Sequence, residues 1–162
     1  MELIKGRAFP FGDNIDTDQI FPGRYLELTD KQAIAQHAMA GVDPDFASQV
    51  QKGDIIVAGR NFGCGSSREH AAITLKECGV GAVIARSFGR IFYRNAINLG
   101  LPVITLPEGL EVQRGDQLTI DLAAGRITVG EKEYSFLPFP EDIQRIIASG
   151  GIIPVIADQL RS

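Results

Sequence analysis

The centre of the chain reads Asp54-Ile-Ile-Val-Ala-Gly-Arg-Asn-Phe-Gly-Cys-Gly-Ser-Ser-Arg-Glu-His-Ala71. It begins with a continuous apolar run over residues 55–58, which is typical of a buried strand. Three glycines follow, separated by polar residues, and glycine lets a ligand approach the backbone closely. The apolar spacing then becomes helical, and Ser66 with Glu69 fits a capping box, so we expect a helix from about Ser66. The stretch therefore predicts a strand, a glycine loop and a helix.

The start of the predicted helix has the features of an anion-binding site. The first turn of a helix presents unpaired N–H groups and the positive end of the helix dipole. Ser66 and Ser67 add hydroxyl groups there, and Arg68 adds a guanidinium that can hold a carboxylate with two hydrogen bonds. A hydroxyl among such donors is more acidic than in water. The alternative is a capped helix with a solvated arginine, but the preceding glycines and strand favour a functional site.

Length and composition restrict the class of protein. A chain of 162 residues is expected to form a single domain over residues 1–162 with a proper core. The net charge of −4 and the absence of a Lys/Arg run argue against nucleic-acid binding. No apolar run approaches the roughly 18 residues of a membrane span, and the N-terminus lacks the apolar segment of a signal peptide. We therefore expect a cytoplasmic protein.

Strand and helix patterns alternate around the central stretch, which indicates an α/β fold. Successive strand–helix–strand units imply a short parallel sheet with right-handed crossovers. The predicted strands of these units are 55–58, 81–85 and 101–106, and the second helix is 87–98. A strand at 3–9 and a helix at 31–39 precede them. A β-meander at 117–121, 126–129 and 133–136 and a last helix at 143–148 follow, so the chain reads as a parallel sheet with a β-rich appendage.

The two cysteines, Cys64 and Cys78, and the two histidines limit the possible metal and thiol chemistry. An iron–sulfur cluster normally needs three or four cysteines, so this chain cannot hold one alone. Cys64 with His70 as its base is a weak nucleophile pair, because a helix start separates them and no acid completes a triad. As a free thiol beside the anion site, Cys64 is a candidate reactive group, and Cys78 is expected in helix core. His37 has no second ligand four residues away and is expected to be exposed.

Three segments together resemble motifs of the swivel domain of the aconitase superfamily, in the same order and over nearly the whole chain. The resemblance implies the swivelling β/β/α fold of the aconitase C-terminal domain. The segments are Asp13-Asn-Ile-Asp-Thr-Asp-Gln-Ile20, Asn61-Phe-Gly-Cys-Gly-Ser-Ser-Arg-Glu-His-Ala71 and Arg86-Ser-Phe-Gly-Arg-Ile-Phe-Tyr-Arg-Asn-Ala-Ile-Asn-Leu-Gly-Leu101.

The resemblance also implies a reaction and roles for five residues. The family interconverts 2- and 3-hydroxy acids by dehydration and rehydration, and the position of Ser66 matches the family's base, which acts as an alkoxide. Ser67 and Arg68 match contacts to a substrate carboxylate. Asp18, and with it Thr17, matches the active-site aspartate motif, and we expect Asp18 to orient the serine and arginine side chains. From the residues alone, this acidic segment is a loop with Asx turns, and it lacks the glycine and distal glutamate of a calcium-binding EF-hand.

The family pattern implies that this chain is the small subunit of a two-chain hydro-lyase. The large subunit carries a [4Fe–4S] cluster, and the two chains form a heterodimer or heterotetramer. Arg90 and Arg94 are expected to be solvated or to face a partner rather than the substrate. A different class of function, a non-catalytic regulatory module that only holds an anion, uses the same loop and stays open at this point.

Substrate choice is expected to depend on the loop Tyr25-Leu26-Glu27-Leu28. In the family, an arginine after Tyr-Leu goes with a third substrate carboxylate, as in homoaconitase, whereas small or apolar residues go with an alkyl group. Glu27 departs from both patterns. Facing the substrate, it repels a third carboxylate, while Leu28 packs against an alkyl group; facing solvent, it has no such role. We therefore expect a preference for alkyl-substituted malates, isopropylmalate first and dimethylmalate or methylmalate next, over citrate and homocitrate.

Overall fold

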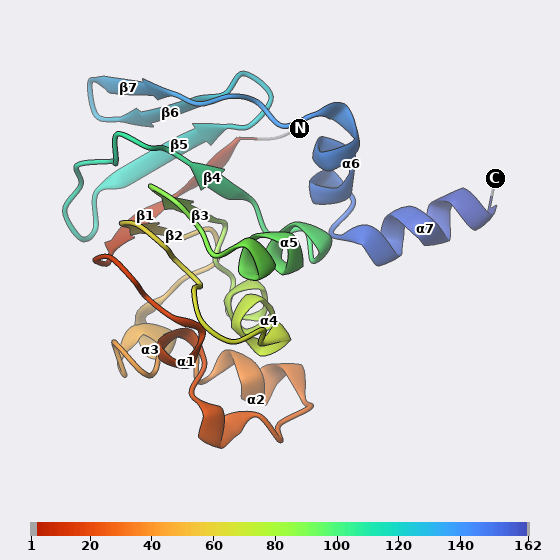
Figure 1. Cartoon of the computed structure of the whole chain (residues 1–162). Helices are drawn as coiled ribbons and strands as arrows, with labels where there is room; N and C mark the ends of the chain where they lie inside the picture. The colour runs from red at the N-terminus through yellow and green to blue at the C-terminus, as the bar shows by residue number, and fades with distance from the viewer. Residues whose placement is uncertain (1–2, 162) are drawn as a thin grey trace.

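The protein, seen in a computed structural model that describes residues 3–161, is built on one seven-stranded sheet (Figure 1). The strand order is β4-β3-β2-β1-β5-β6-β7. The strands are β1 (Ile4–Pro10), β2 (Ile55–Ala58), β3 (Ala82–Ala85), β4 (Val103–Thr105), β5 (Gln117–Asp121), β6 (Arg126–Val129) and β7 (Lys132–Ser135).

Strand β1 joins the two halves of this sheet. On one side it pairs in parallel with β2, with Ala8 opposite Ile55, and β3 and β4 continue the parallel half. On its other side it pairs antiparallel with β5, with Lys5 opposite Thr119, and β6 and β7 complete a meander. The prediction of a short parallel sheet with a β-rich appendage is therefore confirmed.

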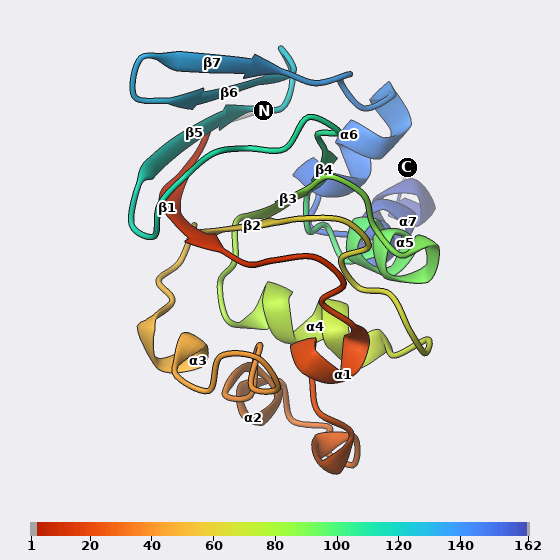
Figure 2. The same cartoon turned by 60° about the vertical axis from the view of Figure 1, so that its left-hand side comes forward.

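Helices α4 and α5 follow β2 and β3 and connect the parallel strands, as the alternating sequence pattern predicts (Figures 1 and 2). Shorter helices precede β2, and two further helices end the chain. The helices are α1 (Thr17–Ile20), α2 (Lys31–Ala35), α3 (Phe46–Gln49), α4 (Glu69–Glu77), α5 (Arg90–Asn98), α6 (Glu141–Ala148) and α7 (Ile152–Arg161), with a 3-10 turn at Gly23–Tyr25.

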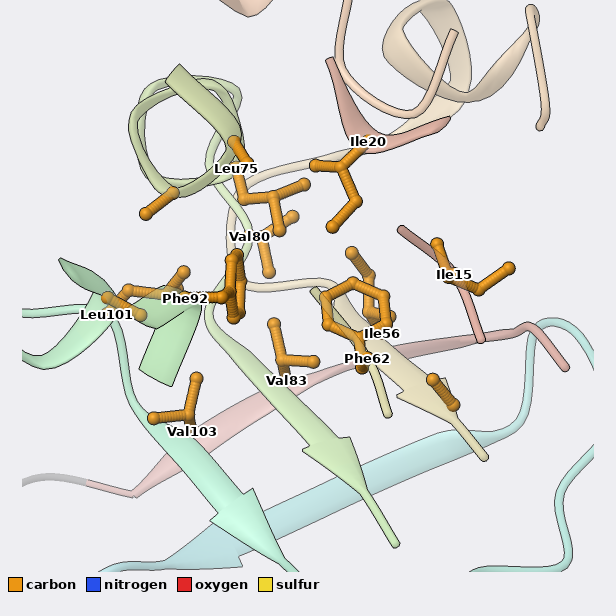
Figure 3. Close-up of a cluster of buried hydrophobic side chains, with 14 of the residues drawn as sticks. Ile15, Ile20, Ile56, Phe62, Leu75, Val80, Val83, Phe92, Leu101 and Val103 are labelled. Atoms are coloured by element: carbon orange, nitrogen blue, oxygen red, sulfur yellow. The ribbon is translucent and has the colours of Figure 1, made fainter. Parts of the chain in front are cut away.

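Two hydrophobic clusters bury the two faces of the parallel strands. Side chains alternate along a strand, so in β2 Ile56 packs in the cluster that contains Leu75 and Phe92 of the helices, whereas Ile55 packs with Leu118 and other meander residues. The meander therefore curls over the face that the helices leave open. Figure 3 shows the helix-side cluster, in which Phe62 of the glycine loop lies beside residues of the strands. This packing anchors the loop to the core.

The helix predicted over 31–39 is shorter, because α2 ends at Ala35 and tight turns follow. Met39 takes a left-handed φ of 59° and donates its N–H to the carbonyl of Ile20 at 2.7 Å. This long-range hydrogen bond replaces further helical turns. The ring of His37 stacks on Tyr25 with centroids 3.7 Å apart, so the expectation of an exposed histidine is wrong.

The C-terminal helix α7 has no counterpart in the sequence-based prediction. Helix α6 ends at the expected glycines, but the chain continues as α7 with Pro154 in its first turn, where proline is tolerated. Figure 1 shows α7 extending away from the sheet, beside α5 and α6. Among residues 3–161, none of the helices has the length and apolar character needed to cross a membrane.

Candidate active site

Two loops meet beyond the carboxyl ends of β1 and β2, and they carry the residues that the sequence analysis singles out. The first loop runs from Pro10 into α1, and the second runs from Ala58 into α4. They pair through backbone hydrogen bonds: the N–H of Gly63 donates to the carbonyl of Ile15 at 2.7 Å, and the N–H of Thr17 donates to that of Cys64 at 2.9 Å. Since β1 and β2 are parallel neighbours, their carboxyl ends, and hence these loops, meet at one edge of the sheet.

Ser66 lies in the loop and not at the start of the helix, so the predicted capping box is wrong. Helix α4 begins at Glu69 with Arg68 as N-cap, and no side chain caps it. Gly65 takes a φ of +103°, which turns the chain after its pairing with the first loop and leaves 66–68 to reach the helix. The Ser66 hydroxyl is therefore free of a capping role.

The hydroxyl of Ser66 meets that of Thr17 instead. Their oxygens, Oγ and Oγ1, are 3.4 Å apart, a weak contact in which either hydroxyl can donate. Thr17 is buried, with 3% of its surface exposed, whereas Ser66 and Ser67 are exposed. Within the described part of the chain, the N–H groups of both serines have no intramolecular acceptor. The backbone N–H groups and the hydroxyls of Ser66 and Ser67 therefore lie together on one exposed turn.

Arg68 crosses from the second loop to the first. Its Nη1 donates to Oδ1 of Asp18 at 2.7 Å and to the carbonyl of Phe21 at 3.3 Å. The Arg68 side chain is largely buried, with 22% of its surface exposed, but the Asp18 side chain is 65% exposed. Within residues 3–161, the Nε and Nη2 groups of Arg68 make no hydrogen bond. The guanidinium is thus held through Nη1, and its Nε and Nη2 groups remain available to donate to a carboxylate.

Asp18 is fixed in its ionised form by its hydrogen bonds. The hydrogen bond from Arg68, and after it one from the Gly23 N–H at 2.9 Å, lower the pKa of the Asp18 carboxyl below its usual value. A Cβ atom at Gly23 would lie 3.3 Å from Nη2 of Arg68, so the absence of a side chain there lets the backbone approach the ion pair. Asp18 therefore contacts Arg68, and within residues 3–161 it makes no hydrogen bond to Ser66.

The loop expected to select the substrate, residues 25–28, contacts α4 through His70. The ring of His70 stacks on Phe21 with centroids 5.3 Å apart, and its Nε2 is 3.3 Å from the carbonyl oxygen of Leu28. Leu28 is half-buried, whereas the neighbouring Glu27 is exposed. His70 thus connects the loop to α4, and it makes no hydrogen bond to Cys64 within the described residues.

The residues of this chain do not fit the iron–sulfur cluster that the family resemblance implies. The thiol of Cys78 donates to the carbonyl of Leu75 at 3.4 Å, and burial raises the pKa of Cys78 to about 11, which opposes thiolate ligation. Only Cys64 remains as a thiol donor. No group of three or more His, Cys, Asp or Glu side chains within residues 3–161 could hold a metal ion.

One contact between the loops was missed by the sequence analysis. Nδ2 of Asn61 donates to Oδ1 of Asn14 at 2.9 Å, and both residues have left-handed backbones, with φ of 59° and 58°. Asparagine is enriched in this conformation. The presence of an asparagine in each of the two quoted motifs was the available signal, but nothing local to either motif indicates the pairing.

Known proteins with similar sequences and structures agree with this architecture. Residues 10–109 match the model of the aconitase C-terminal domain family. The chain is 52% identical to a 3-isopropylmalate dehydratase small subunit of Aliarcobacter butzleri, covering 94% of this chain and 93% of that protein. It is 54% identical to a methanogen homoaconitase small subunit of Methanothermobacter thermautotrophicus, covering 93% and 89%.

A solved structure extends the similarity to the fold. The crystal structure of a 3-isopropylmalate dehydratase from Methanocaldococcus jannaschii superposes with a TM-score of 0.89 at 47% identity, covering 98% of this chain and 95% of that one. The family match spans more than half of the 162 residues, including both loops of the site. The chain therefore belongs to the aconitase C-terminal domain family.

Proposed function

We propose that this chain is the small subunit of a two-chain hydro-lyase that interconverts 2-isopropylmalate and 3-isopropylmalate by dehydration and rehydration, a step of leucine biosynthesis. Relatives with that subunit name are about half identical over nearly the full length. The observation that carries the proposal is the meeting of Ser66, Thr17 and Arg68 on one edge, where a base, a hydroxyl partner and a carboxylate grip adjoin.

In this proposal Ser66 removes the proton next to a substrate carboxylate. A serine hydroxyl is a weak base unless its alkoxide is stabilised. The Thr17 hydroxyl can donate to the Ser66 oxygen. The guanidinium of Arg68, two positions after Ser66, adds a positive charge that favours the alkoxide. The negative charge that develops on the substrate is then stabilised by donors already in place.

Arg68 and Ser67 hold the substrate carboxylate. The Nη1 atom of Arg68 donates to Asp18 and to the carbonyl of Phe21, which holds the side chain in place. A carboxylate that binds Nε and Nη2 would therefore cost little further side-chain entropy. A planar guanidinium matches a carboxylate with two parallel hydrogen bonds. The unpaired N–H groups of the serine turn offer further donors.

The remaining chemistry is assigned to a large subunit. Expulsion of hydroxide calls for a Lewis acid, and we assign a [4Fe–4S] cluster to the partner because this chain's own donor set does not fit one. Ser66 and Ser67 are exposed in the isolated chain. A partner that covers them, in a heterodimer or heterotetramer, would exclude water from the proton transfer.

The experiment is reconstitution with a cluster-loaded large subunit. Absorbance from a double bond conjugated to a carboxylate should develop from 3-isopropylmalate only when both chains are present. Carrying Ser66→Ala through the same reconstitution controls for activity of the large subunit alone. Binding of malate derivatives by this chain without turnover in the complex would instead support a non-catalytic anion-binding module.

A second candidate, the small subunit of a homoaconitase, is favoured by the 54% identity to a protein with that name. The substrates of the two candidates differ, because homoisocitrate carries a third carboxylate where 3-isopropylmalate carries an alkyl group. Comparing kcat/KM for 3-isopropylmalate and homoisocitrate in the same complex separates them, and Glu27 is the residue on which we expect the difference to depend.

A further inference from the structure

Two asparagines connect the loops of the site at a distance from the reacting groups. Nδ2 of Asn61 donates to Oδ1 of Asn14 at 2.9 Å. Around this bond, the N–H of Asn14 donates to the carbonyl of Arg60 at 2.7 Å, and the N–H of Arg60 donates to Oδ1 of Asp13 at 2.7 Å. The side-chain bond thus closes a short ladder between segments 47 positions apart in the sequence.

The backbone at both asparagines is held in a conformation that other L-residues rarely adopt. Their φ angles of 58° and 59° fall in the left-handed region, which costs most non-glycine residues free energy unless the surroundings hold it in place. Asn and Asp bear this conformation better than other residues with side chains. A left-handed asparagine in each loop, with a hydrogen bond between the two side chains, is a specific arrangement and not a generic surface contact.

The two turns lie just upstream of the residues that the mechanism uses. Asn14 precedes Thr17 by three positions, and Asn61 precedes Ser66 by five. The segments between them are joined by the backbone bonds from Gly63 to Ile15 and from Thr17 to Cys64. Any slip of one loop along the other would therefore change the 3.4 Å separation of the Thr17 and Ser66 hydroxyl oxygens.

We propose that the Asn14–Asn61 hydrogen bond is a positioning device that sets the register of the two loops and so aligns Ser66 for proton abstraction. Neither asparagine touches the reacting groups, so both are positioning residues and not catalytic ones. Catalysis is sensitive to this kind of alignment, since a misplacement of about 1 Å can cost on the order of 10²-fold in rate. The proposal rests on the proposed function for its rate effects.

Aspartate substitutions test the hydrogen bond while keeping the backbone conformation. In Asn14→Asp and in Asn61→Asp, the remaining asparagine can still donate its amide to the new carboxylate. In the double variant two ionised carboxylates face each other, and neither has a donor. A double glycine variant, Asn14→Gly with Asn61→Gly, removes the bond without adding charge, and glycine adopts the left-handed backbone readily.

We expect kcat of the reconstituted complex to stay within about threefold of wild type in both single aspartate variants and to fall about tenfold or more in both double variants. The melting temperature of the double glycine variant should change by less than about 4 °C, so a fall in kcat cannot be assigned to unfolding. The added charge affects KM for an anionic substrate, which is why kcat is the readout. A kcat in both double variants within about threefold of wild type would overturn the proposal.

A second readout needs no turnover and separates this proposal from the proposed function. The carbonyl of Cys64 accepts the inter-loop hydrogen bond from the Thr17 N–H, and Cys64 is a half-buried residue with a free thiol. Alkylation of the isolated chain, read by mass spectrometry, should be faster at Cys64 in both double variants than in wild type, with Cys78 unchanged as a measure of global unfolding. An inactive wild-type complex would contradict the proposed function, but equal labelling of Cys64 in all variants would contradict the positioning role.

Discussion

The hydroxyl of Thr17 lies 3.4 Å from the hydroxyl of Ser66, although the two residues are 49 positions apart in the sequence. Thr17 is buried and Ser66 is exposed. The buried partner is fixed by its surroundings, so it presents an ordered hydroxyl to a serine that a substrate can reach. Because Ser66 does not cap α4, its hydroxyl is available for this contact with Thr17.

Ser66→Ala should abolish most turnover and leave the fold intact. Loss of a general base typically lowers the rate by roughly 10²–10⁴-fold. Because Ser66 does not cap α4, the melting temperature should change by less than about 2 °C. Assays of the reconstituted complex, with Ser135→Ala on β7 as a distant control, check both expectations. Activity within about threefold of wild type would show that Ser66 is not the base.

Arg68→Lys should weaken substrate binding although the charge is kept. Lysine lacks the planar fork that engages Asp18 and a carboxylate at once. Loss of a charge-assisted hydrogen bond of about 1.5–3 kcal/mol corresponds to a KM increase of roughly 10–100-fold. Arg126→Lys, at an exposed ion pair with Glu133, is the matched control. Unchanged KM and kcat in Arg68→Lys would remove this residue from the binding site.

The wild-type complex should prefer 3-isopropylmalate to homoisocitrate, and Glu27 should contribute to the preference. Glu27→Arg replaces a repulsion of the third carboxylate with an attraction, so the ratio of the two kcat/KM values should move about tenfold or more toward homoisocitrate. Glu27→Gln removes only the charge and should give an intermediate ratio. A wild-type preference for homoisocitrate would refute this account of the loop.

Stability at low pH should depend on Asp54. Burial by itself raises the pKa of this carboxyl, but hydrogen bonds from the Arg7 side chain, from Gln51 N–H and from Arg7 N–H outweigh burial and lower it. A lowered folded-state pKa means that the ionised group stabilises the fold above the unfolded pKa of about 3.9. That stabilisation is lost as the pH falls through the folded-state pKa.

Urea unfolding across the pH range measures this contribution. At pH 6, Asp54→Asn should lower the unfolding free energy by about 2–3 kcal/mol through lost charge-assisted hydrogen bonds. The difference from wild type should shrink as the pH falls below about 4, because the unfolded carboxyl takes up a proton first and the folded carboxyl follows only at its lowered pKa. Asp45→Asn, at an exposed position, is the control. A difference independent of pH would exclude the ionised carboxylate as its source.

Purified by itself, the chain should contain no iron or labile sulfide and should not turn over 3-isopropylmalate. The chain has two cysteines, and partial burial raises the pKa of Cys78, so Cys64 is the one thiol left as a candidate ligand. Colorimetric iron and sulfide assays check this, with the reconstituted complex as the positive control. A stoichiometric cluster on the isolated chain would contradict the division between subunits.

Much of the fold could be predicted because its signals are local. The apolar run of β2 and the alternating strands of the meander follow from side-chain periodicity. The end of α6 follows from glycines. The prediction was wrong where a long-range contact outweighs a local preference: Met39 bonds to Ile20 and stops helical turns that the sequence favours. Helix α7 was missed because Pro154 stands inside its first turn.

Sequence patterns alone were enough to predict the order of the strands and of the helices α4, α5 and α6, and to locate the glycine loop with Ser66 and Arg68. The family resemblance, also visible in the sequence, assigned roles to these residues. The start of α4 and the contacts between the two loops became visible only in the three-dimensional structure. Capping and periodicity act over a few residues, so sequence patterns record them. The contacts from Thr17 to Ser66, from Asp18 to Arg68 and from Asn14 to Asn61 depend instead on the parallel pairing of β1 with β2, which brings segments nearly fifty positions apart to one edge of the sheet.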